Sequence, residues 1–217
     1  MHLKKYFKFI FLLVVSYLLS FSNLMADTTC QSLYLDKNKI SNIKYIEVKF
    51  DNQRKWQKKL ARVLDPGLNF NSKIKDKNDF HKISFKTIIK NKKKRQKASI
   101  IITYNSGLTC VYKAKIRPHG DSRDHYVIKN GFPLSSMNVH LKNGNIENIT
   151  KFILLLPLTR EGGKDEIFSS ILMKNLKILS PRTSFIKVKI NNKTFKYIFQ
   201  EKIVKEFLEN NKLTEGP

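Results

Sequence analysis

The clearest structural signal in this chain is Ala98-Ser-Ile-Ile-Ile-Thr-Tyr-Asn-Ser-Gly-Leu-Thr-Cys-Val-Tyr-Lys-Ala-Lys-Ile116. It contains two segments with the character of β-strands, residues 98–104 and 108–116. Between them stands Asn105-Ser106-Gly107, and these residue types favour a tight turn. The sequence therefore predicts a β-hairpin near the middle of the chain.

Further elements follow on both sides of this hairpin. Alternating or continuous apolar residues predict strands at 43–50, 135–141, 151–156, 184–190 and 194–200. The last two are predicted to form a second hairpin across Asn191-Asn192. Helices are predicted at 51–64, 164–179 and 201–210. The first has an apolar stripe of Trp56, Leu60, Val63 and Leu64. In the second of these, the side chains expected to face a core are Ile167, Phe168, Ile171, Leu172 and Leu176. This order predicts an α+β fold, a largely antiparallel sheet with helices packed on one side.

The first 26 residues have the pattern of an export signal, with Lys4, Lys5 and Lys8 before an apolar core. We expect cleavage to leave residues 27–217 as a single periplasmic or secreted domain without a stable membrane span, and the alternative is an uncleaved anchor. An exported chain with two cysteines favours a disulfide between Cys30 and Cys110. Two unpaired thiols are the alternative.

The chain is strongly basic, with a formal net charge of +25. Such a charge favours an acidic protein or polymer as partner, and the run at 90–97 is one place to hold it. Of the 42 basic residues, however, 35 are Lys and 7 are Arg, and codon drift in an AT-rich genome gives the same composition. Where Arg is scarce, each Arg is informative, because Lys cannot replace its planar set of donors; motif-like stretches of the second half contain Arg117, Arg123, Arg160 and Arg182. Export and the lack of grouped Arg and aromatic residues argue against a nucleic-acid partner.

A dense group of ionisable residues follows the predicted hairpin. Its members are Arg117, His119, Asp121, Arg123, Asp124 and His125. The arginines suit phosphate or carboxylate, whereas His119, Asp121 and His125 suggest a metal site as a weaker alternative. A loop of mutually neutralising charges is a third interpretation. Arg160, between a buried strand and a helix start, is a further candidate for anion contact, or a member of a helix-capping group.

Several segments of the second half, in this order, resemble the CotH (spore-coat protein H) family of secreted atypical kinases. The resemblance covers about residues 113–217, the part that corresponds to the N-terminal portion of that family. The segments that carry it are 117–123, 151–156, 166–176, Pro181-Arg182 with 185–190, and Tyr197-Ile-Phe-Gln-Glu-Lys202 with 205–209. The loop departs from the family, since it has Arg-Pro-His-Gly-Asp-Ser in place of Arg-Gly-Asn-Ser.

The resemblance implies a kinase-like N-terminal lobe in which the 117–125 loop contacts phosphate, with Glu201 and Lys202 as secondary candidates. The catalytic and metal-binding aspartates of such enzymes lie in a second lobe. We therefore expect an incomplete form without catalytic residues or phosphotransfer, with ATP and a divalent cation as cofactors of a complete form only. The alternative is a non-catalytic envelope module that binds acidic polymers through its basic surface. No oligomeric state is predicted.

Overall fold

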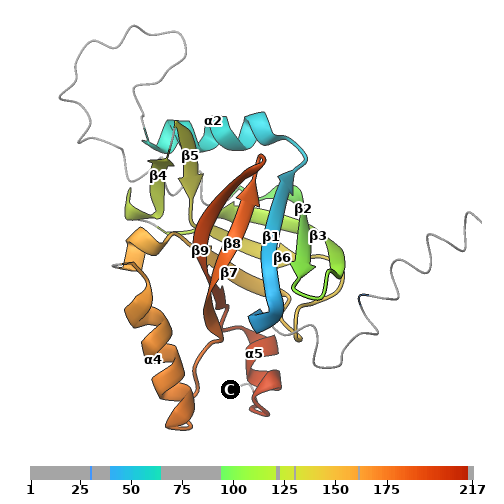
Figure 1. Cartoon of the computed structure of the whole chain (residues 1–217), viewed down its shortest axis with the longest axis vertical. Helices are drawn as coiled ribbons and strands as arrows, with labels where there is room; N and C mark the ends of the chain where they lie inside the picture. The colour runs from blue at the N-terminus through green and yellow to red at the C-terminus, as the bar shows by residue number, and fades with distance from the viewer. Residues whose placement is uncertain are drawn as a thin grey trace, which may run out of the picture.

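The computed structural model describes residue 30 and residues 40–64, 94–120, 123–129, 131–160 and 162–214. Within these residues, seven strands form a closed barrel (Figure 1). In their order around the barrel, they are β1 (Ile43–Phe50), β2 (Gln96–Tyr104), β3 (Thr109–Pro118), β6 (Met137–Leu141), β7 (Lys151–Leu155), β9 (Lys193–Glu201) and β8 (Thr183–Ile190). A separate hairpin consists of β4 (Tyr126–Lys129) and β5 (Phe132–Ser135).

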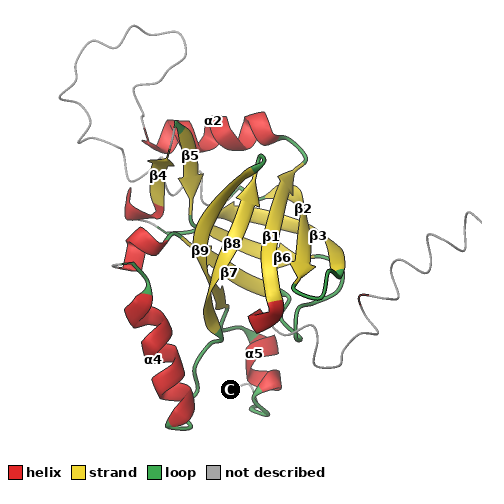
Figure 2. Ribbon diagram, viewed as in Figure 1, coloured by secondary structure: helices red, strands yellow, loops and turns green. Residues whose placement is uncertain are grey.

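Helices are short and lie outside the barrel wall (Figure 2). The α-helices of the described part are α2 (Gln53–Leu64), α4 (Lys164–Asn175) and α5 (Lys205–Asn210). Its 3₁₀ turns are η1 (Ile40–Asn42), η3 (Arg123–His125) and η4 (Pro157–Arg160). Among the described residues, no helix is long and apolar enough to cross a membrane.

The predicted α+β fold, with an open sheet and helices packed on one side like a kinase lobe, is wrong. The sheet closes because β1 pairs in parallel with β8, through Ile46–Val188, Glu47–Lys189 and Val48–Ile190. All other neighbouring strands of the barrel are antiparallel. Closure removes the exposed edges that β1 and β8 would otherwise present.

Alternate residues of the strands fill the interior of the barrel. In β2 and β3 every second side chain is buried, as expected where one face of a sheet meets a core. Large fully buried side chains occupy the centre, among them Tyr104, Phe152, Tyr197 and Phe199. The outer face remains polar or basic over most strands, so the hydrophobic core lies inside the barrel rather than under a layer of helices.

One end of the barrel is covered by α2 (Figure 1). Its Trp56, Leu60 and Val63 are buried, which confirms the predicted apolar stripe of this helix. The Trp56 ring stacks on Phe50 with 4.2 Å between ring centroids. The β4–β5 hairpin, which was not predicted, also contacts α2.

Both predicted hairpins are confirmed. The pairing of β2 with β3 runs across Asn105–Gly107, and that of β8 with β9 runs across Asn191 and Asn192. These asparagines have φ of 50° and 61°, the left-handed conformation that a tight hairpin turn requires. The disulfide between Cys30 and Cys110 is also confirmed, and its Cα atoms lie 5.8 Å apart. The predicted export signal at residues 1–26 lies outside the described residues.

The predicted packing of α4 on the core is wrong. The helix forms, but none of its residues is buried. Its first turns are held at the outer wall, where Ile167 packs against Ile153, Leu155 and Ile198. Phe168 and Leu176, which were expected to face the core, are 65% and 61% exposed. The predicted helix at 201–210 is shorter than expected, because β9 continues through Glu201 and α5 begins at Lys205.

Candidate anion-binding site

The loop that follows β3 is fixed by backbone hydrogen bonds to the junction between β5 and β6. His119 N donates to Ser136 O at 2.8 Å, and Ser136 N donates to His125 O at 2.8 Å. Gly120 has φ of 90°, and a Cβ at this position would lie 1.8 Å from the His125 ring. The loop therefore has a defined path in which glycine is required.

The histidines of the loop lie close together. Their ring centroids, in His119 and His125, are 5.3 Å apart in an edge-to-face arrangement. Asp121, the third member of the alternative metal site, lies outside the described residues. Within the described part, no group of three or more His, Cys, Asp or Glu side chains is arranged to hold a metal ion.

Three further residues that the sequence suggested for anion contact lie on 3₁₀ turns. Arg123 and Asp124 belong to η3, where Asp124 is exposed, and Arg160 ends η4. The two turns contact each other. The structure therefore brings η4, the turn that Arg160 ends, into contact with η3 of the loop.

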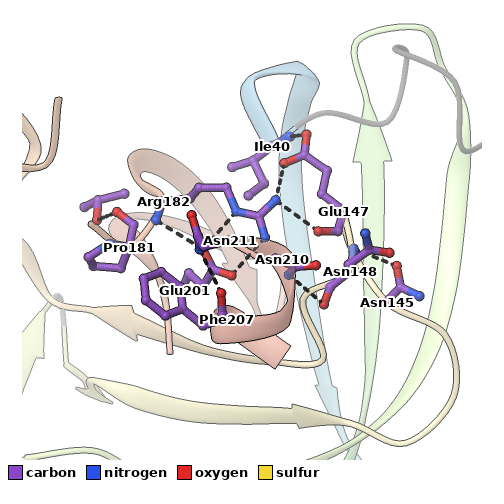
Figure 3. A network of polar contacts seen from close by, with 11 residues as sticks. Ile40, Asn145, Glu147, Asn148, Pro181, Arg182, Glu201, Phe207, Asn210 and Asn211 are labelled. Atoms are coloured by element: carbon purple, nitrogen blue, oxygen red, sulfur yellow. Dashed lines mark hydrogen bonds and ion pairs between the residues drawn. The ribbon is translucent and has the colours of Figure 1, made fainter. Parts of the chain in front are cut away.

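Glu201 has a structural partner rather than a free carboxylate. It is 4% exposed, and Arg182 donates to its two oxygens from Nε at 2.9 Å and from Nη2 at 2.8 Å (Figure 3). Arg182 Nη1 also donates to the carboxylate and carbonyl of Glu147, at 3.1 and 3.0 Å. Burial opposes the charge of Arg182, but these acceptors outweigh it and raise its pKa.

This ion-pair group borders a hollow of about 1100 Å³ beside α5. Arg182, Glu147 and Glu201 contribute to its wall, together with Ile171 and Lys174 of α4. Because Arg182 is paired with two carboxylates, its guanidinium is not available to an anionic ligand in this hollow.

Uncompensated positive charge is concentrated on the outer face of the barrel instead. Strand pairing places Lys97 of β2 opposite Lys115 of β3, Lys115 opposite His140 of β6, and His140 opposite Lys151 of β7. Lys202 follows β9 and donates its backbone N–H to Lys151 O at 3.2 Å. We call these five residues the basic row.

The basic row faces outward. Lys97 and Lys115 are exposed and the other members are half-buried, whereas strand neighbours such as Ala98, Ile116 and Val139 lie inside the barrel. With roughly 4.8 Å between strands, the row extends about 19 Å across the wall.

Further cations lie beside the basic row. Arg117 is in register with Asn138 on the next strand, and its Nε is buried without a hydrogen-bond partner among the described residues. Arg95 Nη1 lies 3.5 Å from His140 Nδ1. Lys59 of α2 donates from Nζ to Lys94 O at 2.6 Å, so the basic surface extends to the helix at the barrel end.

These basic side chains destabilise one another's charged form, and this lowers the pKa of two lysines. Burial lowers the pKa of Lys202, and so do Arg117, Arg95 and Lys151. The pKa of Lys59 falls to about 8 through burial and through Lys94 and Arg117. The same residue, Arg117, therefore acts on two lysines from different elements.

One carboxylate from α5 reaches the basic row within the described part. Glu206 accepts from Lys151 Nζ at 3.2 Å and from Thr150 Oγ1 at 2.8 Å. Burial alone would raise the pKa of Glu206, but these hydrogen bonds and one to its own backbone lower it overall. This single acid leaves most of the basic row uncompensated. Like charges placed opposite each other destabilise a sheet.

Sequence reasoning identified Arg117 and Lys202 but missed the arrangement to which they belong. Lys97 belongs to the basic run at 90–97, whereas no local motif distinguishes Lys115 or Lys151 from the many other lysines. The register of the predicted hairpin was the available signal, since a turn at Asn105–Gly107 places Lys97 opposite Lys115.

Compared with protein families and with curated proteins, the chain has no match. The resemblance to the CotH family stays a prediction, and the kinase-like lobe that it implied is replaced by a barrel.

Proposed function

We propose that this chain is a non-catalytic binding module that holds an acidic, phosphate-bearing polymer across the basic row. The observation that carries the proposal is the register of Lys97, Lys115, His140 and Lys151 on four neighbouring strands. Such an arrangement costs stability in the free protein. A polyanion laid along the row would remove that cost.

The shape of the surface favours a polymer over a small molecule. The basic row lies on the outer wall of a closed barrel, whereas small-ligand sites are concave and largely enclosed. A row about 19 Å long, with one basic side chain on each neighbouring strand at roughly 4.8 Å intervals, suits a chain of regularly spaced anions.

The arginines beside the lysines suit an oxyanion such as phosphate. A guanidinium offers several donors in a plane, and it binds phosphate oxygens in pairs. Arg117 carries a buried Nε without a partner in the described part, and Arg95 lies next to His140. A phosphate bound at this part of the row would offer acceptors to a guanidinium.

The test compares two pairs of lysines that differ in position but not in kind. Lys97→Gln with Lys115→Gln removes one end of the basic row, where the two residues face each other. Lys187→Gln with Lys196→Gln removes a facing pair that is also exposed, on the β8–β9 hairpin. Both double variants lose the same formal charge.

Binding of sodium polyphosphate is measured for each protein at several salt concentrations. We expect the row pair to weaken binding about tenfold and to lower the slope of log Kd against log salt by about 1 to 2. The control pair should change Kd less than about twofold. Equal losses in both pairs would contradict the proposal, and so would a wild-type protein that does not bind.

A further inference from the structure

We infer that the exposed end of α4 docks on an anionic lipid bilayer by immersing its apolar side chains in the headgroup region. This inference does not depend on the basic row. It concerns residues 168–179, which extend from the barrel wall past the end of the barrel (Figure 1).

The end of α4 exposes an unusual amount of apolar surface. Phe168, Ile171 and Leu172 are 65%, 53% and 45% exposed. After the helix, Leu176, Ile178 and Leu179 add to the same region, at 61%, 53% and 43%. A contiguous exposed region of this kind marks an interaction surface on a folded protein.

The contacts of α4 with the barrel use only a narrow side of the helix. Ile167 packs on the outer wall, and Ser170 Oγ donates to Pro181 O at 2.6 Å. At about 100° per residue, the exposed side chains from Ile171 to Met173 then spread over roughly 200° of the helix circumference. A groove on a partner protein covers a stripe of about 100°, whereas lipid surrounds whatever is immersed in it.

The charge of the α4 end indicates which kind of surface it docks on. Residues 167–200 contain no Asp or Glu, and Lys174 and Lys177 stand among the apolar residues of the α4 end. Lysines placed among apolar side chains suit a bilayer surface. The stem of such a lysine stays in the apolar layer while its ammonium group reaches the anionic headgroups. A second copy of a chain with net charge +25 would be repelled.

The variants for the test replace exposed residues only, so that the fold is retained. Leu176→Asn with Ile178→Asn removes apolar area at the α4 end. The matched control is Ile128→Asn with Leu158→Asn, whose side chains are 61% and 71% exposed elsewhere on the surface. Each full-length protein is sedimented with vesicles of phosphatidylglycerol and phosphatidylcholine, and with vesicles of phosphatidylcholine alone.

We expect wild type and control to bind the anionic vesicles, with weak binding to the neutral ones. The α4 variant should partition at least about tenfold less. In addition, Leu176→Trp should show a blue-shifted emission with anionic vesicles and no shift with soluble polyphosphate. Lys97→Gln with Lys115→Gln should leave that shift in place, so that failure of the polymer site and failure of this site can be told apart.

Three outcomes would overturn the inference. The first is vesicle binding without a blue shift of Leu176→Trp, because adsorption would then not involve the α4 end. The second is equal partition of the α4 variant and its control. The third is self-association of the wild-type protein, abolished by the α4 variant, in place of vesicle binding, because the occupant would then be a second copy.

Discussion

At the scale of single residues, arginine scarcity proved informative in two different ways. Arg182 is held by Glu201 and Glu147 and acts within the fold. Arg117 has no such partner for its buried Nε in the described part of the chain, and it lowers the pKa of lysines on two other elements. Composition pointed to both residues, but only their surroundings separate an arginine held within the fold from the one that we propose for anion binding.

Lys59 gives a prediction for stability against pH. Folding lowers its pKa from 10.5 to about 8, first by burial and then through Lys94 and Arg117. A lysine with a depressed pKa contributes stability above pH 10.5, and this contribution is lost as the pH falls through 8. Between pH 8 and 10.5, the wild-type protein should therefore gain stability relative to Lys59→Gln.

Urea unfolding at several pH values between 7 and 10.5 measures this difference. Lys55→Gln, at an exposed position of the same helix, is the control and should follow the wild-type protein. A constant difference between wild type and Lys59→Gln would show that the lysine titrates alike in the folded and unfolded chain.

At the scale of elements, local sequence signals were sufficient to predict the hairpins but not the packing of α4. Turn residues between alternating segments predicted β2–β3 and β8–β9, because both strands of a hairpin and their turn are contiguous in sequence. The apolar side chains of α4 also predicted a helix, which forms. Which surface they contact is not a local property, and an apolar residue such as Phe168 has the same sequence signature on a core as on an exposed face.

The Arg182 group connects three elements and predicts a stability effect at this scale. Arg182 precedes β8, Glu201 ends β9, and Glu147 lies between β6 and β7 and accepts from the Ile40 N–H at 2.9 Å. Arg182→Met would leave the Glu201 carboxylate buried without its cation. We expect the free energy of unfolding to fall by about 3 kcal/mol.

The control is the double variant Arg182→Met with Glu201→Leu, which removes the buried charge as well. It should recover part of the stability that Arg182→Met loses, and chemical unfolding of the three proteins gives the comparison. A double variant less stable than Arg182→Met would mean that Glu201 contributes to the fold without its ion pair.

At the scale of the whole molecule, closure of the barrel could not be predicted from the sequence. The parallel pairing of β1 with β8 joins Ile46 to Val188 across most of the chain, and alternation of apolar residues is the same in an open sheet and a barrel. The candidate site depends on the same long-range order. The strands β3, β6, β7 and β9 lie side by side in the barrel. Only this pairing makes neighbours of Lys115, His140, Lys151 and Lys202.

The distribution of charge over the molecule supports one central claim, that a polyanion lies along the basic row. His140 stands in the middle of that row, between Lys115 and Lys151. Burial lowers its pKa, and Lys142, Lys151 and Arg95 lower it further against the opposing effect of Glu206. An anion bound beside it would favour the protonated imidazole and raise the pKa.

The most direct test is an NMR titration of the His140 imidazole with and without saturating polyphosphate, assigned with His140→Gln. We expect the pKa of His140 to lie below the ordinary histidine value in the free protein and to rise clearly when polyphosphate is bound. Polyphosphate that binds the protein while the pKa of His140 stays unchanged would contradict it.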